Sequence, residues 1–112
     1  MITVENTPGL GRYQIRVDGE IAGYSAYEVH GDLVAFMHTE IEDRFAGQGL
    51  GVTLVARALD QIREQGGSIL PYCPFVRWFL AHHPEYADLV PPDERGVFEF
   101  SDPDPEVEDD RA

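Results

Sequence analysis

The sequence contains no lysine, and its eight basic residues, all arginine, stand against 21 acidic residues, giving a net charge of −13. Because phosphate groups bind to basic surfaces, this shortage of positive charge argues against DNA, RNA or an anionic membrane as a long-range partner. A cationic partner or an amine substrate is electrostatically easier. The plainer interpretation is that the acidity keeps the protein soluble and that the missing lysine reflects genomic base composition.

Cysteine and long apolar runs are also scarce. The one cysteine, Cys73, excludes a disulfide within the chain, so we expect a reducing, cytoplasmic location. No apolar run approaches the ~18 residues of a membrane span, and no basic-then-apolar start indicates a signal peptide. The sequence has no HExxH motif and no Cys/His cluster, so we predict that no metal is bound.

The length of 112 residues suits one small domain, and 43% hydrophobic residues can fill its core. The last stretch, residues 101–112, holds six acids, two prolines and one arginine. Such a segment cannot bury enough apolar surface to offset the ordering of its backbone. We predict one folded domain over residues 1–100 and a disordered acidic tail over residues 101–112.

Alternating apolar and polar residues predict four antiparallel strands, over residues 2–6, 13–17, 21–29 and 33–41. The dipeptide Asp18-Gly19 is typical of a tight type I′ hairpin, because both central residues of that turn need a positive φ. Gly31-Asp32 marks the next turn. The first part of the chain is therefore predicted to fold as an antiparallel meander.

Helical spacing of apolar residues then predicts a helix over residues 52–65, which Gly66-Gly67 ends. A short fifth strand over residues 68–73 would run parallel to the fourth if this helix is a right-handed crossover. Pro74 suits the first position of a second helix, which ends at His82-His83-Pro84. The predicted fold class is mixed α+β (α/β), a meander followed by a β-α-β unit.

A glycine-rich turn, Gly47-Gln48-Gly49-Leu50-Gly51, lies between the fourth strand and the first helix. Successive N–H groups there can point at one cluster of anionic oxygens, and the helix dipole adds roughly half a positive charge. Glycine lets the backbone approach a pyrophosphate, and Arg44 is close in the chain. The turn is neither a P-loop nor a Rossmann fingerprint. The structural alternative is a glycine-rich helix start that only packs tightly.

The segment from Arg44 to Gly49, RFAGQG, resembles the R/Q-x-x-G-x-G/A signature of the GNAT superfamily of N-acetyltransferases. Further segments resemble a small-sized branch of that superfamily: His38-Thr39 before the turn, the Pro-x-Cys segment of residues 71–76, and His83-Pro84-Glu85-Tyr86. These segments cover about residues 33–90 and follow one another in the same order as in that branch.

Most members of the superfamily insert two helices after the first strand. Only residues 7–12 lie there in this chain, which is too short for either helix.

The resemblance implies a GNAT-like fold whose fourth and fifth strands splay apart, with acetyl-CoA as co-substrate. The pantetheine arm would lie between these strands and the pyrophosphate at the turn. A parallel pair with an anion site at its switch point is also where ligands generally bind. The implied cofactor-binding residues are Thr39, Ile41, Arg44, Ala46, Gly47, Gln48, Gly49, Leu50 and Gly51.

The implied reaction is acetyl transfer to an amine, which needs positioning, oxyanion stabilisation and removal of a proton. Glu40 is a candidate base, and His38, on the same face by period two, is another. Cys73 is a candidate nucleophile, activated by the helix start at Pro74 or by His38. The structural alternatives are a surface acid for Glu40, a partly buried histidine for His38, and an active-site wall or a small core residue for Cys73.

Two other classes of function stay open. A non-catalytic coenzyme A-binding module would share the pyrophosphate site and differ at the three candidate catalytic residues. A small α/β interaction domain would bind no ligand. The implied acceptor is a small amine or a protein amine. The missing helices leave no visible pocket for it, and a cleft this open would suit a protein amine, a polyamine or another exposed cation. We expect a monomer or a weak homodimer.

Overall fold

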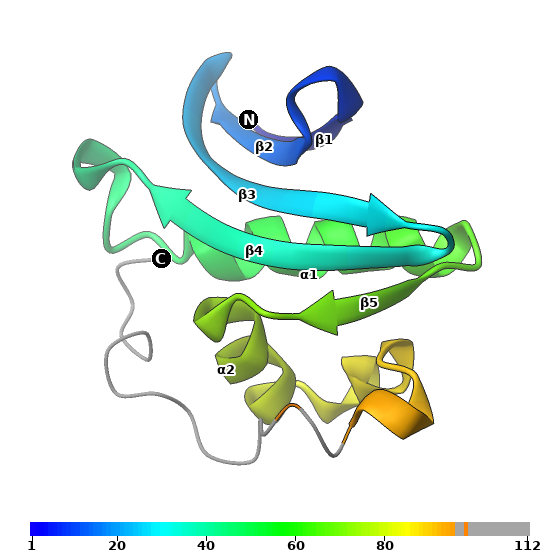
Figure 1. Ribbon diagram of the computed structural model, residues 1–112. Coiled ribbons are helices and arrows are strands. Elements are labelled where there is room, and N and C mark those ends of the chain that lie inside the picture. The colour runs from blue at the N-terminus through cyan, green and yellow to red at the C-terminus, as the bar shows by residue number, and fades with distance from the viewer. Residues whose placement is uncertain (96–97, 99–112) are drawn as a thin grey trace.

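Five strands form one sheet in the order β1-β2-β3-β4-β5 (Figure 1). The computed structural model describes residues 1–95 and residue 98. The strands are β1 (Ile2–Thr7), β2 (Arg12–Val17), β3 (Glu20–His30), β4 (Leu33–Ile41) and β5 (Ser68–Pro71). Neighbours from β1 to β4 pair antiparallel, and β5 pairs parallel with β4. The predicted mixed α+β class is confirmed, whereas the predicted tail over 101–112 lies outside the described residues.

Tight local turns account for the meander. Asp18 and Gly19 have φ values of 51° and 89°, both positive as the type I′ turn requires, and Val17 pairs with Glu20 across them. Between β1 and β2 the chain makes only a short 3₁₀ turn, Pro8–Leu10. The predicted absence of two helices at this point is confirmed.

Two helices, α1 (Leu50–Glu64) and α2 (Pro74–His82), pack with the sheet around a hydrophobic core. Figure 1 shows α1 running behind the middle strands. Its buried stripe consists of Leu50, Gly51, Leu54, Val55, Ala58, Leu59 and Ile62. The helix begins two residues before the predicted start, because Gly49 takes the left-handed conformation and caps it. Pro74 opens α2 as predicted, since its fixed φ suits the first helical position.

The parallel pairing between β4 and β5 is short and ends where Phe36 pairs with Pro71. The predicted fifth strand over residues 68–73 is therefore two residues too long. Cys73 lies outside it, because this residue caps α2 and donates its N–H to the Phe36 carbonyl at 2.8 Å. β4 continues to Ile41 with β3 as its neighbour. The two parallel strands thus part at their carboxyl ends.

A β-bulge interrupts the pairing of β3 with β4. Phe36 pairs with Tyr27, but His38 pairs with Ala26, so Met37 is an extra residue in β4. A bulge changes the direction of the strand and of the side chains that follow it. The bulge therefore decides which β3 residues face the last residues of β4.

Gly23 brings β3 and β4 close together at this end of the sheet. A Cβ atom at Gly23 would overlap the carbonyl oxygen of Glu40 and the side chain of Ile41. We expect Gly23→Ala to lower the free energy of unfolding by about 1–3 kcal/mol, because the backbone cannot yield as a side chain would. Urea unfolding measures this. Gly9→Ala is the matched control, since a Cβ atom there meets nothing within 4 Å; equal stability of the two variants would contradict the close approach.

Candidate functional site

The turn between β4 and α1 takes its shape from two glycines. Gly47 and Gly49 have φ values of 81° and 71°, in the region that side chains disfavour. A Cβ atom on either glycine would meet nothing within 4 Å, so the backbone borders open space. The structure therefore places together, before and at the start of α1, the sequence-predicted residues Ala46, Gly47, Gln48, Gly49, Leu50 and Gly51.

Among the residues that the structure describes, the amides of this turn have no acceptor. The first helical N–H with an acceptor belongs to Thr53, which donates to the Gly49 carbonyl at 3.2 Å. Within residues 1–95 and 98, no group accepts a hydrogen bond from the N–H groups of residues 47–52. No side chain caps the helix start. Consecutive amides and the positive end of the helix dipole are thus available to an anion.

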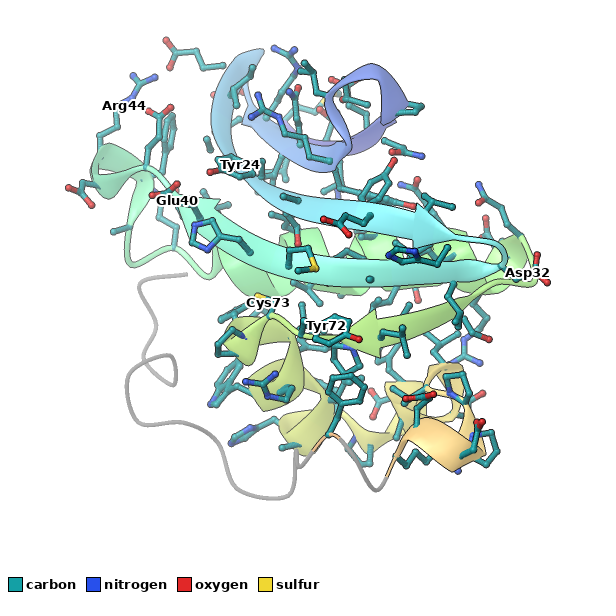
Figure 2. All side chains as sticks on the ribbon, in the orientation of Figure 1. Tyr24, Asp32, Glu40, Arg44, Tyr72 and Cys73 are labelled. Carbon is teal, nitrogen blue, oxygen red and sulfur yellow. The ribbon has the colours of Figure 1, made fainter. Side chains whose placement is uncertain are left out.

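Arg44 precedes the turn, but its charge is engaged by carboxylates. Its guanidinium lies 3.2 Å from Glu42 and 3.3 Å from Glu20, and it stacks 4.6 Å from the centroid of the Phe45 ring. Figure 2 shows this side chain at a corner of the molecule, beyond the end of β4. To contact an anion at the turn, Arg44 would have to leave both carboxylates.

A row of polar side chains crosses the place where β4 and β5 part. Thr39 Oγ1 accepts a hydrogen bond from the Cys73 thiol at 3.4 Å and shares one with Ser25 Oγ at 2.8 Å. Ser25 and Cys73 are buried and Thr39 is half-buried. Cys73 lies at the helix start, as the sequence indicates, but its sulfur contacts Thr39. No contact among the described residues supports activation of this thiol by His38.

Glu40 and His38 form a cluster on the outer side of β4, as period two predicts. His38 Nε2 lies 3.7 Å from Glu40 Oε1, and the Tyr24 hydroxyl donates to the same oxygen at 2.9 Å. The guanidinium of Arg12 lies 4.7 Å from the centroid of the Tyr24 ring. Figure 2 shows Tyr24 and Glu40 side by side across the two strands. The interpretation of His38 as a partly buried histidine is wrong, because 60% of its side chain is exposed.

A pocket of about 550 Å³ opens beside this cluster. Its lining residues are Arg12, Ile21, Gly23, Tyr24, Glu40, Ile41, Glu42 and Asp43. Three of them are acidic and one is basic, so the lining attracts cations. The sequence alone shows no pocket for the acceptor. In the folded sheet, β2, β3, the end of β4 and the residues that follow it line this one.

Tyr24 is the site residue that the sequence pattern does not single out. Counted from the tight turn between β3 and β4, a regular hairpin would pair Tyr24 with Thr39. The extra residue at Met37 shifts the register, and Tyr24 pairs with Glu40 instead. Nothing in the strand's alternation of residues marks this bulge, so the contact becomes visible only in the folded sheet.

Among residues 1–95 and 98, no three His, Cys, Asp or Glu side chains gather in a way that could hold a metal ion. None of the helices described is long and apolar enough to cross a membrane.

Comparison with known families defines the class of protein. The sequence model of the GCN5-related N-acetyl-transferase family matches residues 12–89. This range includes four of the five strands and both α-helices. The chain therefore belongs to the GCN5-related N-acetyltransferase family, as the resemblance to the GNAT superfamily predicts. The narrower assignment to a small-sized branch stays a prediction.

A solved structure has a similar fold. The solution NMR structure of a GCN5-like protein from Staphylococcus aureus superposes with a TM-score of 0.60. The two sequences are 21% identical, and the match covers 79% of this chain and 86% of the other. At this identity the likeness concerns the fold. No protein with a curated description matches the chain.

Proposed function

We propose that the protein is an N-acetyltransferase that takes its acetyl group from acetyl-CoA and passes it to an amine. One observation carries this proposal. The amides of residues 47–52, which follow the end of β4, have no acceptor within residues 1–95 and 98, in a member of this family. Acetyl-CoA supplies a thioester whose carbonyl carbon an amine can attack. The chain's own residues must bind it, position the amine and remove a proton.

The turn before α1 suits the pyrophosphate of coenzyme A. Gly49 has no side chain to block the approach, and a Cβ atom there meets nothing within 4 Å. The amides of Gln48, Leu50 and Gly51 would donate to the phosphate oxygens together with those of the two left-handed glycines. Because these donors are main-chain groups, the site needs no lysine.

The edge of β4 that β5 leaves open suits the pantetheine arm. The Glu42 N–H donates to the Ala22 carbonyl on β3 at 2.8 Å. Alternate residues of a strand direct their backbone groups to opposite sides, so those of Thr39 and Ile41 point away from β3. β5 ends before it reaches them. The amide groups of the arm would pair with this edge as an added strand does.

We propose direct attack by the amine, with Glu40 as the base and Cys73 as part of the site wall. The side chain of Glu40 is 60% exposed and borders the pocket. Cys73 is only 2% exposed and its thiol is hydrogen-bonded to Thr39, so an amine or a thioester would meet it as part of the wall. His38, next to Glu40, is the other candidate base.

The acidic pocket supports a cationic amine as the acceptor. Glu40, Glu42 and Asp43 lie in its lining with the guanidinium of Arg12, and Glu42 is paired with Arg44. An amine that carries a second positive charge would place this charge near Asp43. A coenzyme A-binding module without catalysis is the competing function, since it needs the turn but not the pocket.

Coenzyme A binding tests the proposal first. At 100 times its Kd, coenzyme A is expected to stabilise the protein by roughly 2.7 kcal/mol. Gly49→Glu should abolish this stabilisation, because it places bulk and negative charge on the turn. Gly66→Glu is the matched control: Gly66 has a φ of 77°, also borders open space, and follows the other end of α1. A wild-type protein without stabilisation, or a folded Gly49→Glu variant with unchanged affinity, would remove the proposal.

The role of Cys73 is tested by brief incubation with acetyl-CoA, followed by mass spectrometry. A nucleophilic thiolate would attack the thioester carbonyl, release the thiol of coenzyme A and leave a hydroxylamine-labile acetyl group on Cys73. With direct attack, we expect an unmodified Cys73 alongside normal turnover, and Cys73→Ala should keep turnover within about tenfold of the wild type. An acetyl-Cys73 that forms and disappears at the rate of turnover would contradict direct attack.

The acceptor class is tested with amines of equal chain length, measured by release of the coenzyme A thiol. A diamine should exceed the corresponding monoamine in kcat/KM by about tenfold, and the difference should shrink as salt screens the exposed carboxylates. Asp43→Asn should reduce the preference. Binding of coenzyme A without turnover of any amine would instead favour the non-catalytic module.

A further inference from the structure

One oxygen of the Glu40 carboxylate accepts a hydrogen bond, and among the described residues the other does not. The Tyr24 hydroxyl donates to Oε1 at 2.9 Å, and His38 Nε2 lies 3.7 Å from the same atom. Among residues 1–95 and 98, no hydrogen bond or ion pair involves Oε2. At the wall of the pocket, Oε1 is therefore fixed by its hydrogen bond, and Oε2 remains available to a ligand.

We infer that Tyr24 is a positioning residue that holds Glu40 so that its free oxygen Oε2 faces the incoming amine. This inference rests on the proposed function, because it assigns Glu40 as the group that takes the proton. In the step itself, the amine nitrogen bonds to the acetyl carbon and loses a proton to Oε2. The C–S bond of the thioester breaks, and coenzyme A leaves as a thiolate. The thiolate takes a proton from water and becomes the thiol, and Glu40 returns its proton to the solvent. Tyr24 does not touch the reacting atoms and acts through Glu40.

Tyr24 can position Glu40 because its own ring is packed between neighbouring side chains. Its ring lies under the Arg12 guanidinium, 4.7 Å from centroid to carbon, and meets the His38 ring edge-on at 6.1 Å. An aromatic side chain with two rotatable bonds is ordered more easily than a glutamate with three. Glu40 is 60% exposed, so without a partner its carboxylate would sample many positions. A hydrogen bond to an ionised acceptor is among the stronger ones.

The register of the sheet fixes this pair. Tyr24 and Glu40 are direct cross-strand partners, because the bulge at Met37 shifts the pairing by one residue. Gly23, next to Tyr24, keeps the two strands in close approach. The contact is therefore set by the backbone and does not depend on two flexible surface side chains meeting by chance.

The ionisation of Tyr24 agrees with this geometry. Its hydrogen bond to Glu40, followed by burial and the negative charge of Glu40, raises the pKa of Tyr24 above its usual 10.0, and the charge of Arg12 acts in the opposite sense. Removing the Glu40 charge should therefore bring the Tyr24 pKa down. The groups that face the pair are Arg12 from β2 and His38 from β4.

The test compares Tyr24→Phe with Tyr27→Phe. Tyr27 lies on the same strand, and its hydroxyl donates to Asn6 at 2.6 Å, away from the pocket. We expect Tyr24→Phe to lower kcat by about tenfold, with the KM for acetyl-CoA and the stabilisation by coenzyme A unchanged. Tyr27→Phe should leave kcat unchanged. In a Glu40→Gln background, Tyr24→Phe should have no further effect, because the residue acts through that carboxylate.

Side-chain NMR of the same variants gives a readout that is independent of activity. Rotamer averaging of Glu40 should increase in Tyr24→Phe but not in Tyr27→Phe, and the Tyr24 ring should titrate at lower pH in Glu40→Gln. Unchanged kcat in Tyr24→Phe, an additive loss in the double variant, or a Glu40 side chain that stays equally ordered without Tyr24 would each overturn the inference. If the wild type acetylates no amine, the proposed function is wrong. The NMR comparison then still tests whether Tyr24 orders the Glu40 side chain.

Discussion

The difference in length between β4 and β5 is the constraint on which the candidate site depends. The two strands pair through four positions and stop at Phe36 and Pro71, where the chain turns into α2. β4 continues to Ile41 and is paired there with β3 but no longer with β5. In the part of the chain that the structure describes, no strand pairs with β4 on this edge beside Thr39 and Ile41, and the Cys73 cap lies against Thr39. A longer β5 would close that edge and remove the place for an extended ligand.

A strongly acidic protein can still bind an anion if the donors belong to the main chain. The net charge is −13, there is no lysine, and Arg44 is paired with two carboxylates. The amides of residues 47–52 and the start of α1 supply positive potential without any basic side chain. The side chains nearby are then free to be acidic, which suits an amine acceptor next to an anionic cofactor. The main-chain amides of the turn would attract the anionic cofactor, and the acidic side chains near the end of β4 would attract the amine.

Local signals explain why much of the fold was predictable. The Asp18-Gly19 turn, the helical stripe of α1 and Pro74 each act through neighbours in the chain, and the structure bears out the elements they indicate. Two element boundaries differ from the sequence prediction, and both differences have local causes. The Gly49 cap starts α1 two residues earlier, and Cys73 caps α2 and is not part of β5. The glycine-rich turn was predictable because its position between a strand and a helix is itself a local property.

The sequence by itself determined the class of fold, the family signature and the residues of the turn before α1, because turn chemistry, helical periodicity and short motifs all act over a few residues. Only the tertiary structure decided that Tyr24 meets Glu40, that Arg44 turns toward carboxylates, and that an acidic pocket exists. These features depend on the register between strands. A single bulge at Met37 changes that register, and no local pattern in the chain encodes it.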